Sequence, residues 1–125
     1  MRQRWSTLTT AVSAAVLMGT LGLPTVVQAA DGASASVIAQ GRKIAFNRKK
    51  GNCLACHQIE GGKLAGNIGP PLVAMKTRFP DKAKLRAQIW DASVNNPNTI
   101  MPPFGRHKIL TESEIDKVVE FIYSL

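Results

Sequence analysis

The pattern of apolar and polar residues predicts a helical protein whose helices are separated by long irregular segments. Apolar residues recur at helical spacing over residues 36–47, 81–94 and 112–125, and a short helix is expected over residues 53–58. No segment shows the strict alternation of a half-buried strand. The fold class predicted from this pattern is therefore all-α, with about four helices.

Residues suited to cap helices stand at the expected helix starts. Ser34 or Ser36 can cap the first helix, and Asp81 the third. Thr111 and Glu114 form the S/T-x-x-E pattern of a capping box before the last helix. Each start is therefore marked locally in the sequence.

Gly41 interrupts the apolar stripe of the first helix. Glycine inside a helix costs about 1 kcal/mol relative to alanine. A glycine at this position predicts that another helix packs directly against its backbone.

Two glycine- and proline-rich stretches predict long loops, at about residues 59–74 and 95–110. Long loops without regular structure inside a compact domain usually serve a function. Such loops are able to wrap a cofactor.

The first 29 residues have the three parts of a secretory signal peptide. Arg2 and Arg4 form a positive head, residues 8–23 are mostly apolar, and Pro24 and Ala29 mark the cleavage region. An uncleaved membrane anchor is the alternative, but a span needs about 20 predominantly apolar residues. We expect cleavage after Ala29, a periplasmic domain over residues 30–125, and no membrane span in the mature protein.

The charge balance is strongly basic, with 16 Lys and Arg against 8 Asp and Glu and a formal net charge of +8. Basic residues cluster over residues 42–50 and 76–86. These clusters predict either a solvated surface or docking to an acidic partner. Nucleic acid is a third partner class, which an exported chain rarely meets, so we expect none.

The chain is short and only 6% aromatic, so its domain has little material for a core. Domains of this size often depend on a disulfide, a metal or a cofactor. The sequence has 2 cysteines, Cys53 and Cys56, and both lie in one motif.

That motif, Cys53-Leu54-Ala55-Cys56-His57, has the C-x-x-C-H spacing of covalent c-type haem attachment. One helical turn presents both thiols to the two vinyl groups of one macrocycle and sets His57 below its iron. A thioredoxin-like pair would need a βαβ context. A zinc site would need four ligands, for example both cysteines with His57 and His107. A structural disulfide would leave His57 without a role.

Methionine opposite histidine is a known axial pair in electron-transfer cytochromes. Met101 precedes Pro102 and Pro103, which restrict the backbone and can hold an extended segment against the ring. This favours Met101 as the ligand and Met75 as core filler. His107 is the alternative ligand, which would lower the reduction potential.

A ligating histidine usually donates its second ring N–H to an acceptor. The Pro70 carbonyl is a candidate acceptor for His57, with Leu72 against the ring edge. An ordinary Pro-Pro loop explains the same spacing equally well.

Together these features resemble the class I cytochromes c. The resemblance rests on Gly41 and Phe46 in the first helix, C-x-x-C-H, the sequence Gly-Pro-x-Leu at 69–72, and a methionine in a proline-rich loop before a final amphipathic helix. It implies that Pro70 supports His57 and that Met101 is the sixth iron ligand.

A narrower resemblance, to the SoxX cytochromes of sulfur-oxidation complexes, covers nearly all of residues 30–125. Its most specific part is the run from Asn96 to His107, and the run from Gly51 to His57 and the ending from Ile109 to Ile115 also match. It implies a heterodimer with a SoxA-like cytochrome whose reactive cysteine takes part in joining thiosulfate to a carrier-protein cysteine. This chain would then be the electron-accepting subunit of an L-cysteine S-thiosulfotransferase, not catalytic alone, and would pass electrons to a downstream acceptor. A free-standing periplasmic electron carrier is the alternative.

Overall fold

The computed structural model describes residues 33–125. The elements, in chain order, are α1 (Ala35–Phe46), the 3₁₀ turn η1 (Cys53–Ala55), α2 (Met75–Arg78), α3 (Lys82–Trp90), the 3₁₀ turn η2 (Ala92–Val94) and α4 (Glu112–Tyr123). This part of the chain contains no strand, which confirms the all-α prediction. The expected signal peptide lies outside the described residues, so it and the domain boundary at residue 30 remain predictions. None of the described helices is long and apolar enough to cross a membrane.

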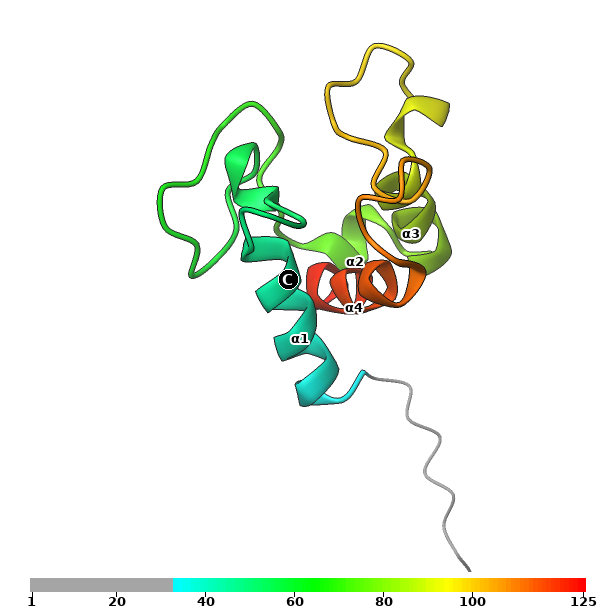
Figure 1. The fold of residues 1–125 in the computed structure, drawn as a ribbon. Coiled ribbons are helices and arrows are strands. Elements are labelled where there is room, and N and C mark those ends of the chain that lie inside the picture. Colours follow the sequence, from blue (N-terminus) through cyan, green and yellow to red (C-terminus); the bar gives the residue numbers. More distant parts are fainter. Residues whose placement is uncertain (1–32) are drawn as a thin grey trace, which may run out of the picture.

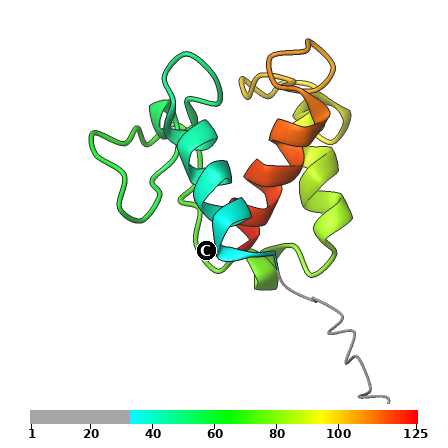
Figure 2. The same ribbon diagram turned by 60° about the horizontal axis from the view of Figure 1, so that its bottom comes forward.

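Helices α1 and α4 cross and form the base of the fold, with α3 beside α4 (Figures 1 and 2). The core is built mainly from the inner face of α4, where Ile115 and Val118 are almost fully buried. Two long loops rise at the same end of this base, one on each side (Figure 1). We name residues 52–74 the attachment loop and residues 91–110 the methionine loop.

The two crossing helices touch backbone to backbone at Gly41. A Cβ atom on Gly41 would lie 1.9 Å from the Lys117 carbonyl oxygen and 2.9 Å from the Phe121 Cβ. One turn further along α1, the rings of Phe46 and Phe121 pack edge to face with centroids 5.8 Å apart. The prediction that a helix packs against Gly41 is therefore confirmed, and the helix is α4.

The predicted caps are also present. The Ser34 side chain accepts the Val37 N–H at 3.4 Å, and Asp81 accepts the Ala83 N–H at 2.8 Å. At α4 the Thr111 hydroxyl accepts the Glu114 N–H at 3.2 Å, and the Glu114 carboxylate accepts the Thr111 N–H at 3.1 Å.

The helix expected over residues 53–58 is shorter than predicted. Only the single turn η1 forms, because loop N–H groups take the carbonyls that a longer helix would use: Gly66 donates to Leu54 at 2.8 Å and Gly69 to Cys56 at 2.8 Å. Asn52 does not cap this turn with its side chain and instead adopts a left-handed conformation at φ 46°.

The short helix α2 was not predicted. It forms where the Met75 N–H donates to the carbonyl of the C-terminal residue Leu125 at 2.9 Å, a contact between distant parts of the chain. The Met75 side chain is buried in the core, as the sequence predicts.

We expect Gly41→Ala to lower the free energy of unfolding by about 1–3 kcal/mol, the usual cost of overpacking against a neighbour that cannot move aside. Helix propensity alone would give the opposite sign, a gain of about 1 kcal/mol. Denaturant titration of the haem-loaded protein decides between them. Gln40→Ala, at an exposed α1 position, is the control and should change little, and a stabilised Gly41→Ala would contradict the contact.

Candidate functional site

We name residues 53–57 the attachment turn. This turn places the two cysteines and His57 on one tight bend. The Cys53 carbonyl accepts the N–H groups of Cys56 at 3.3 Å and of His57 at 2.9 Å. The cysteines are not joined in a disulfide. Burial raises the pKa of Cys53 to about 11, so its thiol keeps its proton at neutral pH and is a poor partner for disulfide exchange.

The His57 ring is held in place by a hydrogen bond and a close glycine contact from the attachment loop. Its Nδ1–H donates to the Pro70 carbonyl at 2.7 Å. With the proton on Nδ1, the lone pair of Nε2 is available to a metal ion. Gly69 lies against the same ring, and a Cβ there would come within 2.5 Å of Cε1.

The attachment loop is tied to the turn mostly through its backbone. In addition to the bonds from Gly66 and Gly69, the Leu72 N–H donates to the Gln58 carbonyl at 2.9 Å. Gly66 approaches Ala55 so closely that a Cβ would lie 2.1 Å from its carbonyl oxygen. The Leu72 side chain is half-buried and packs at the edge of the core.

Met101 lies on the second loop and is half-buried at the edge of the core. Its backbone N–H donates to the Thr99 hydroxyl at 3.2 Å. Two prolines follow, and then Phe104, which is buried. His107 is exposed two residues beyond Gly105.

Trp90 holds the methionine loop to the end of α3. It ends α3, and its carbonyl accepts the Gly105 N–H at 3.0 Å. Gly105 packs on the indole ring, where a Cβ would lie 2.1 Å from Cδ2. Trp90 therefore anchors the segment that follows Met101. A tryptophan ending a helix 15 residues before a glycine carries no sequence signal of this contact.

The large exposed apolar side chains of the described chain all lie on the two loops. The attachment loop carries Leu64, Ile68 and Val73, and the methionine loop carries Val94, Ile100 and Ile109. Val94 and Ile100 are 78% and 70% exposed. A flat apolar macrocycle held between the loops would remove such surface from water. The thiols, the oriented imidazole and these apolar side chains fit a covalently bound haem.

The residues described contain no cluster of three or more His, Cys, Asp or Glu side chains able to hold a metal ion. The zinc alternative, which needs both histidines together with both cysteines, therefore has no support in this part of the chain.

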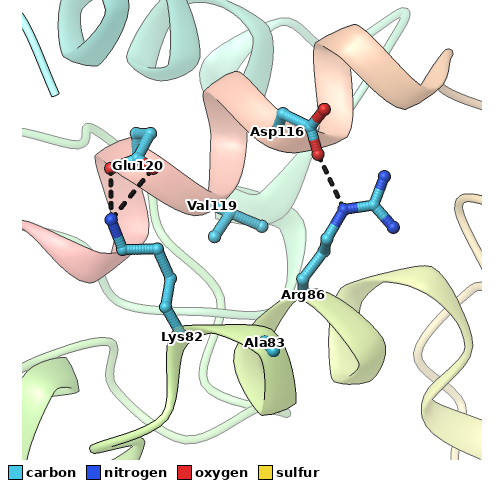
Figure 3. Close-up of a pocket in the computed structure, with 6 residues that line it drawn as sticks. All are labelled: Lys82, Ala83, Arg86, Asp116, Val119 and Glu120. Carbon is cyan, nitrogen blue, oxygen red and sulfur yellow. Dashed lines mark hydrogen bonds and ion pairs between the residues drawn. The ribbon is translucent and has the colours of Figure 1, made fainter.

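A separate shallow pocket of about 190 Å³ lies between α3 and α4. Figure 3 shows that ion pairs occupy it: Lys82 contacts Glu120 at 2.9 Å and Arg86 contacts Asp116 at 2.7 Å, with Val119 between them. The charges in this pocket satisfy one another, so it stabilises the packing of the two helices and offers no haem-binding chemistry.

Comparison with known proteins agrees with this site. The Cytochrome c family profile matches residues 38–125. The chain belongs to the cytochrome c family. A cytochrome c of this kind carries covalent haem c, and the chain has one attachment motif for it. The predicted cofactor and the predicted function of the protein as an electron-transfer cytochrome are therefore confirmed.

Two relatives refine the family assignment. A chain in the crystal structure of SoxXA from P. pantotrophus is similar to this protein, with a TM-score of 0.62 and 28% sequence identity. The match covers 69% of this chain and 79% of the SoxXA chain. This match confirms the resemblance to SoxX cytochromes. An uncharacterized lipoprotein of Aquifex aeolicus (strain VF5) is 36% identical over 76 residues, which make up 60% of this chain and 37% of that relative.

We expect Gly69→Ala to displace the His57 ring, because the added methyl group overlaps it. Unfolding of the haem-loaded protein should become easier by about 1–3 kcal/mol, and the visible haem spectrum should change. Asn67→Ala, at an exposed position of the same loop, is the matched control. Wild-type stability and spectrum in Gly69→Ala would show that the ring is not held at this place.

Proposed function

We propose that this protein is an exported monohaem cytochrome that serves as the electron-accepting subunit of a SoxAX-type thiosulfate-oxidising complex. The observation that carries the proposal is the similarity to SoxXA in both fold and sequence. The partner is a SoxA-like cytochrome, and the pair acts as an L-cysteine S-thiosulfotransferase in which this chain is not catalytic alone.

Within this proposal, Cys53 and Cys56 form the thioethers to haem c, and His57 and Met101 are the axial ligands. When bound, the haem supplies a one-electron Fe(III)/Fe(II) couple. The Pro70 carbonyl orients His57 through the 2.7 Å hydrogen bond, and Leu72 covers the ring edge. Methionine ligation favours a higher reduction potential than bis-histidine ligation, which suits an electron acceptor.

The cysteine content supports a division of labour between two subunits. Joining thiosulfate to a cysteine forms an S–S bond and releases the thiol proton and two electrons. The thiol must come from another protein, because this chain has 2 cysteines and both are used by the haem. The electrons reach this chain singly and leave to a downstream acceptor.

Export is the second part of the proposal. A signal peptide over residues 1–29, cleaved after Ala29, would deliver the domain to the periplasm, where c-type haem is attached. The similarity to a lipoprotein supports a location outside the cytoplasm.

The distribution of charge supports docking near the attachment turn. In the basic run over residues 76–86, Lys82 and Arg86 pair with acidic residues of α4. In the run over residues 42–50, within the described chain, Lys50 alone forms an ion pair, with Glu114. Arg48 and Lys49 are exposed just before Cys53, so we propose that an acidic surface of the redox partner docks there.

The two methionines provide a matched test of the axial ligand. We expect Met101→Leu to lower the reduction potential and to abolish the methionine-to-ferric-iron absorption band, because leucine has no sulfur ligand. Met75→Leu conserves volume in the core and should cost less than about 1.5 kcal/mol of stability with the band unchanged. A larger spectral change in Met75→Leu would make Met101 the wrong ligand.

The functional test is affinity purification of the tagged mature protein from the periplasm of thiosulfate-grown cells, with haem staining and mass spectrometry. We expect a stoichiometric second cytochrome that bears a cysteine outside its haem motifs. Recovery of a lone monohaem protein at both low and moderate salt would contradict the subunit proposal and favour a diffusing electron carrier.

The same purification tests the docking face. Arg48→Glu/Lys49→Glu should weaken the association, increasingly so at low salt, where surface charges act over longer distances. Lys76→Glu/Lys84→Glu changes the same number of charges on the other basic run and is the matched control. Equal losses in both variants would assign the effect to net charge and not to this face.

A further inference from the structure

Asp91 is the buried charged residue of the described chain, with 7% of its surface exposed. It stands at the start of the methionine loop, directly after Trp90. One carboxylate oxygen accepts the Ser93 N–H at 3.0 Å and the Ser93 hydroxyl at 2.5 Å, which caps η2. The hydroxyl hydrogen bond, more than any other contact, lowers the pKa of Asp91, so the carboxylate is ionised at neutral pH.

The second carboxylate oxygen of Asp91 reaches across to the far end of the same loop. The Arg106 guanidinium forms an ion pair with it, with Nε 2.9 Å from the oxygen. The neighbouring Trp90 carbonyl accepts the N–H groups of Gly105 at 3.0 Å and of Arg106 at 3.5 Å. Both ends of the segment that contains Met101 are therefore joined at one place, by an ion pair and by the backbone.

The interior of that segment is held much more weakly. The Met101 N–H has a single contact, with Thr99 two residues away, and Ile100 beside it is largely exposed. Pro102 and Pro103 have no N–H group to donate. The position of Met101 is consequently set from the base of the loop, where Phe104 and Gly105 are buried.

We infer that the Asp91–Arg106 ion pair is a clamp that positions Met101 and opposes its release from the haem iron. The inference rests on the proposal that Met101 is the sixth ligand. Asp91 and Arg106 are positioning residues, since neither is itself a ligand. With the clamp closed, the loop cannot lift away from Trp90 without separating the Asp91 carboxylate from the Arg106 guanidinium, which leaves the carboxylate with its Ser93 hydrogen bonds alone.

The test uses the haem-loaded protein and the rate at which added imidazole replaces the sixth ligand of the ferric haem. Asp91→Asn keeps an acceptor for Ser93 but loses the ion pair, and Arg106→Gln removes the cation from a half-exposed side chain. We expect each to bind imidazole up to about fivefold faster, the scale of one partly exposed ion pair, with a weaker methionine-to-iron band and a lower potential. The double variant should bind imidazole no faster than either single variant. Arg106→Lys keeps the positive charge, so its imidazole rate should lie between those of the wild type and Arg106→Gln.

Lys82→Gln is the matched control, because it removes an ion pair between α3 and α4 without touching the methionine loop. Its imidazole rate should equal that of the wild type, and an equal acceleration would overturn the clamp in favour of general loosening. If Asp91→Asn does not fold, Arg106→Gln decides. A wild-type rate in Arg106→Gln, with the methionine band intact, would overturn the clamp and leave Met101 as the ligand. If the wild type lacks the band, the ligand proposal and the clamp both fail.

Discussion

The backbone contact between α1 and α4 at Gly41 is the constraint on which the rest of the structure depends. Because no Cβ intervenes, the Lys117 carbonyl lies directly against α1, and the two helices form a compact base for a small domain. The end of α1 then leads into the attachment turn. Helix α4 also packs on α3, which leads into the methionine loop. The relative position of the attachment loop and the methionine loop is thus set by this helix crossing.

The two loops are held to that base by different means. The attachment loop is tied by backbone hydrogen bonds to η1 and by close glycine contacts, which leave little freedom to His57. The methionine loop is fixed at its base by Asp91, Trp90 and Arg106, while its middle is exposed. If His57 and Met101 are the two axial ligands, as proposed, the ligand on the methionine loop is the one held by fewer contacts.

The exposed apolar side chains on both loops are surface that the polypeptide alone does not bury. A domain of this size buries a modest fraction of its surface, and a covalent haem supplies the missing apolar partner. The cofactor is therefore part of the core as well as the redox centre. In the proposed function both cysteines are used for haem attachment, so that function requires a second subunit to supply the reactive thiol.

Features that depend on neighbours within about four residues could be predicted from the sequence. The caps at Ser34, Asp81 and Thr111 are of this kind, as is the C-x-x-C-H turn, whose chemistry is written in the spacing itself. Gly41 predicted a helix contact because glycine destabilises a helix interior unless another segment packs closely against it. The sequence did not identify the helix that makes this contact.

The features that only the tertiary structure decided all join residues distant in the chain. The turn η1 stops after three residues because loop N–H groups compete for its carbonyls, and α2 forms where Met75 meets the C-terminus. The pairing of Asp91 with Arg106, and of Lys82 and Arg86 with acidic residues of α4, depends on which charges the fold brings within reach. A charge or a carbonyl carries no sequence mark of its distant partner, so these contacts, and the clamp inferred from them, follow from the fold alone.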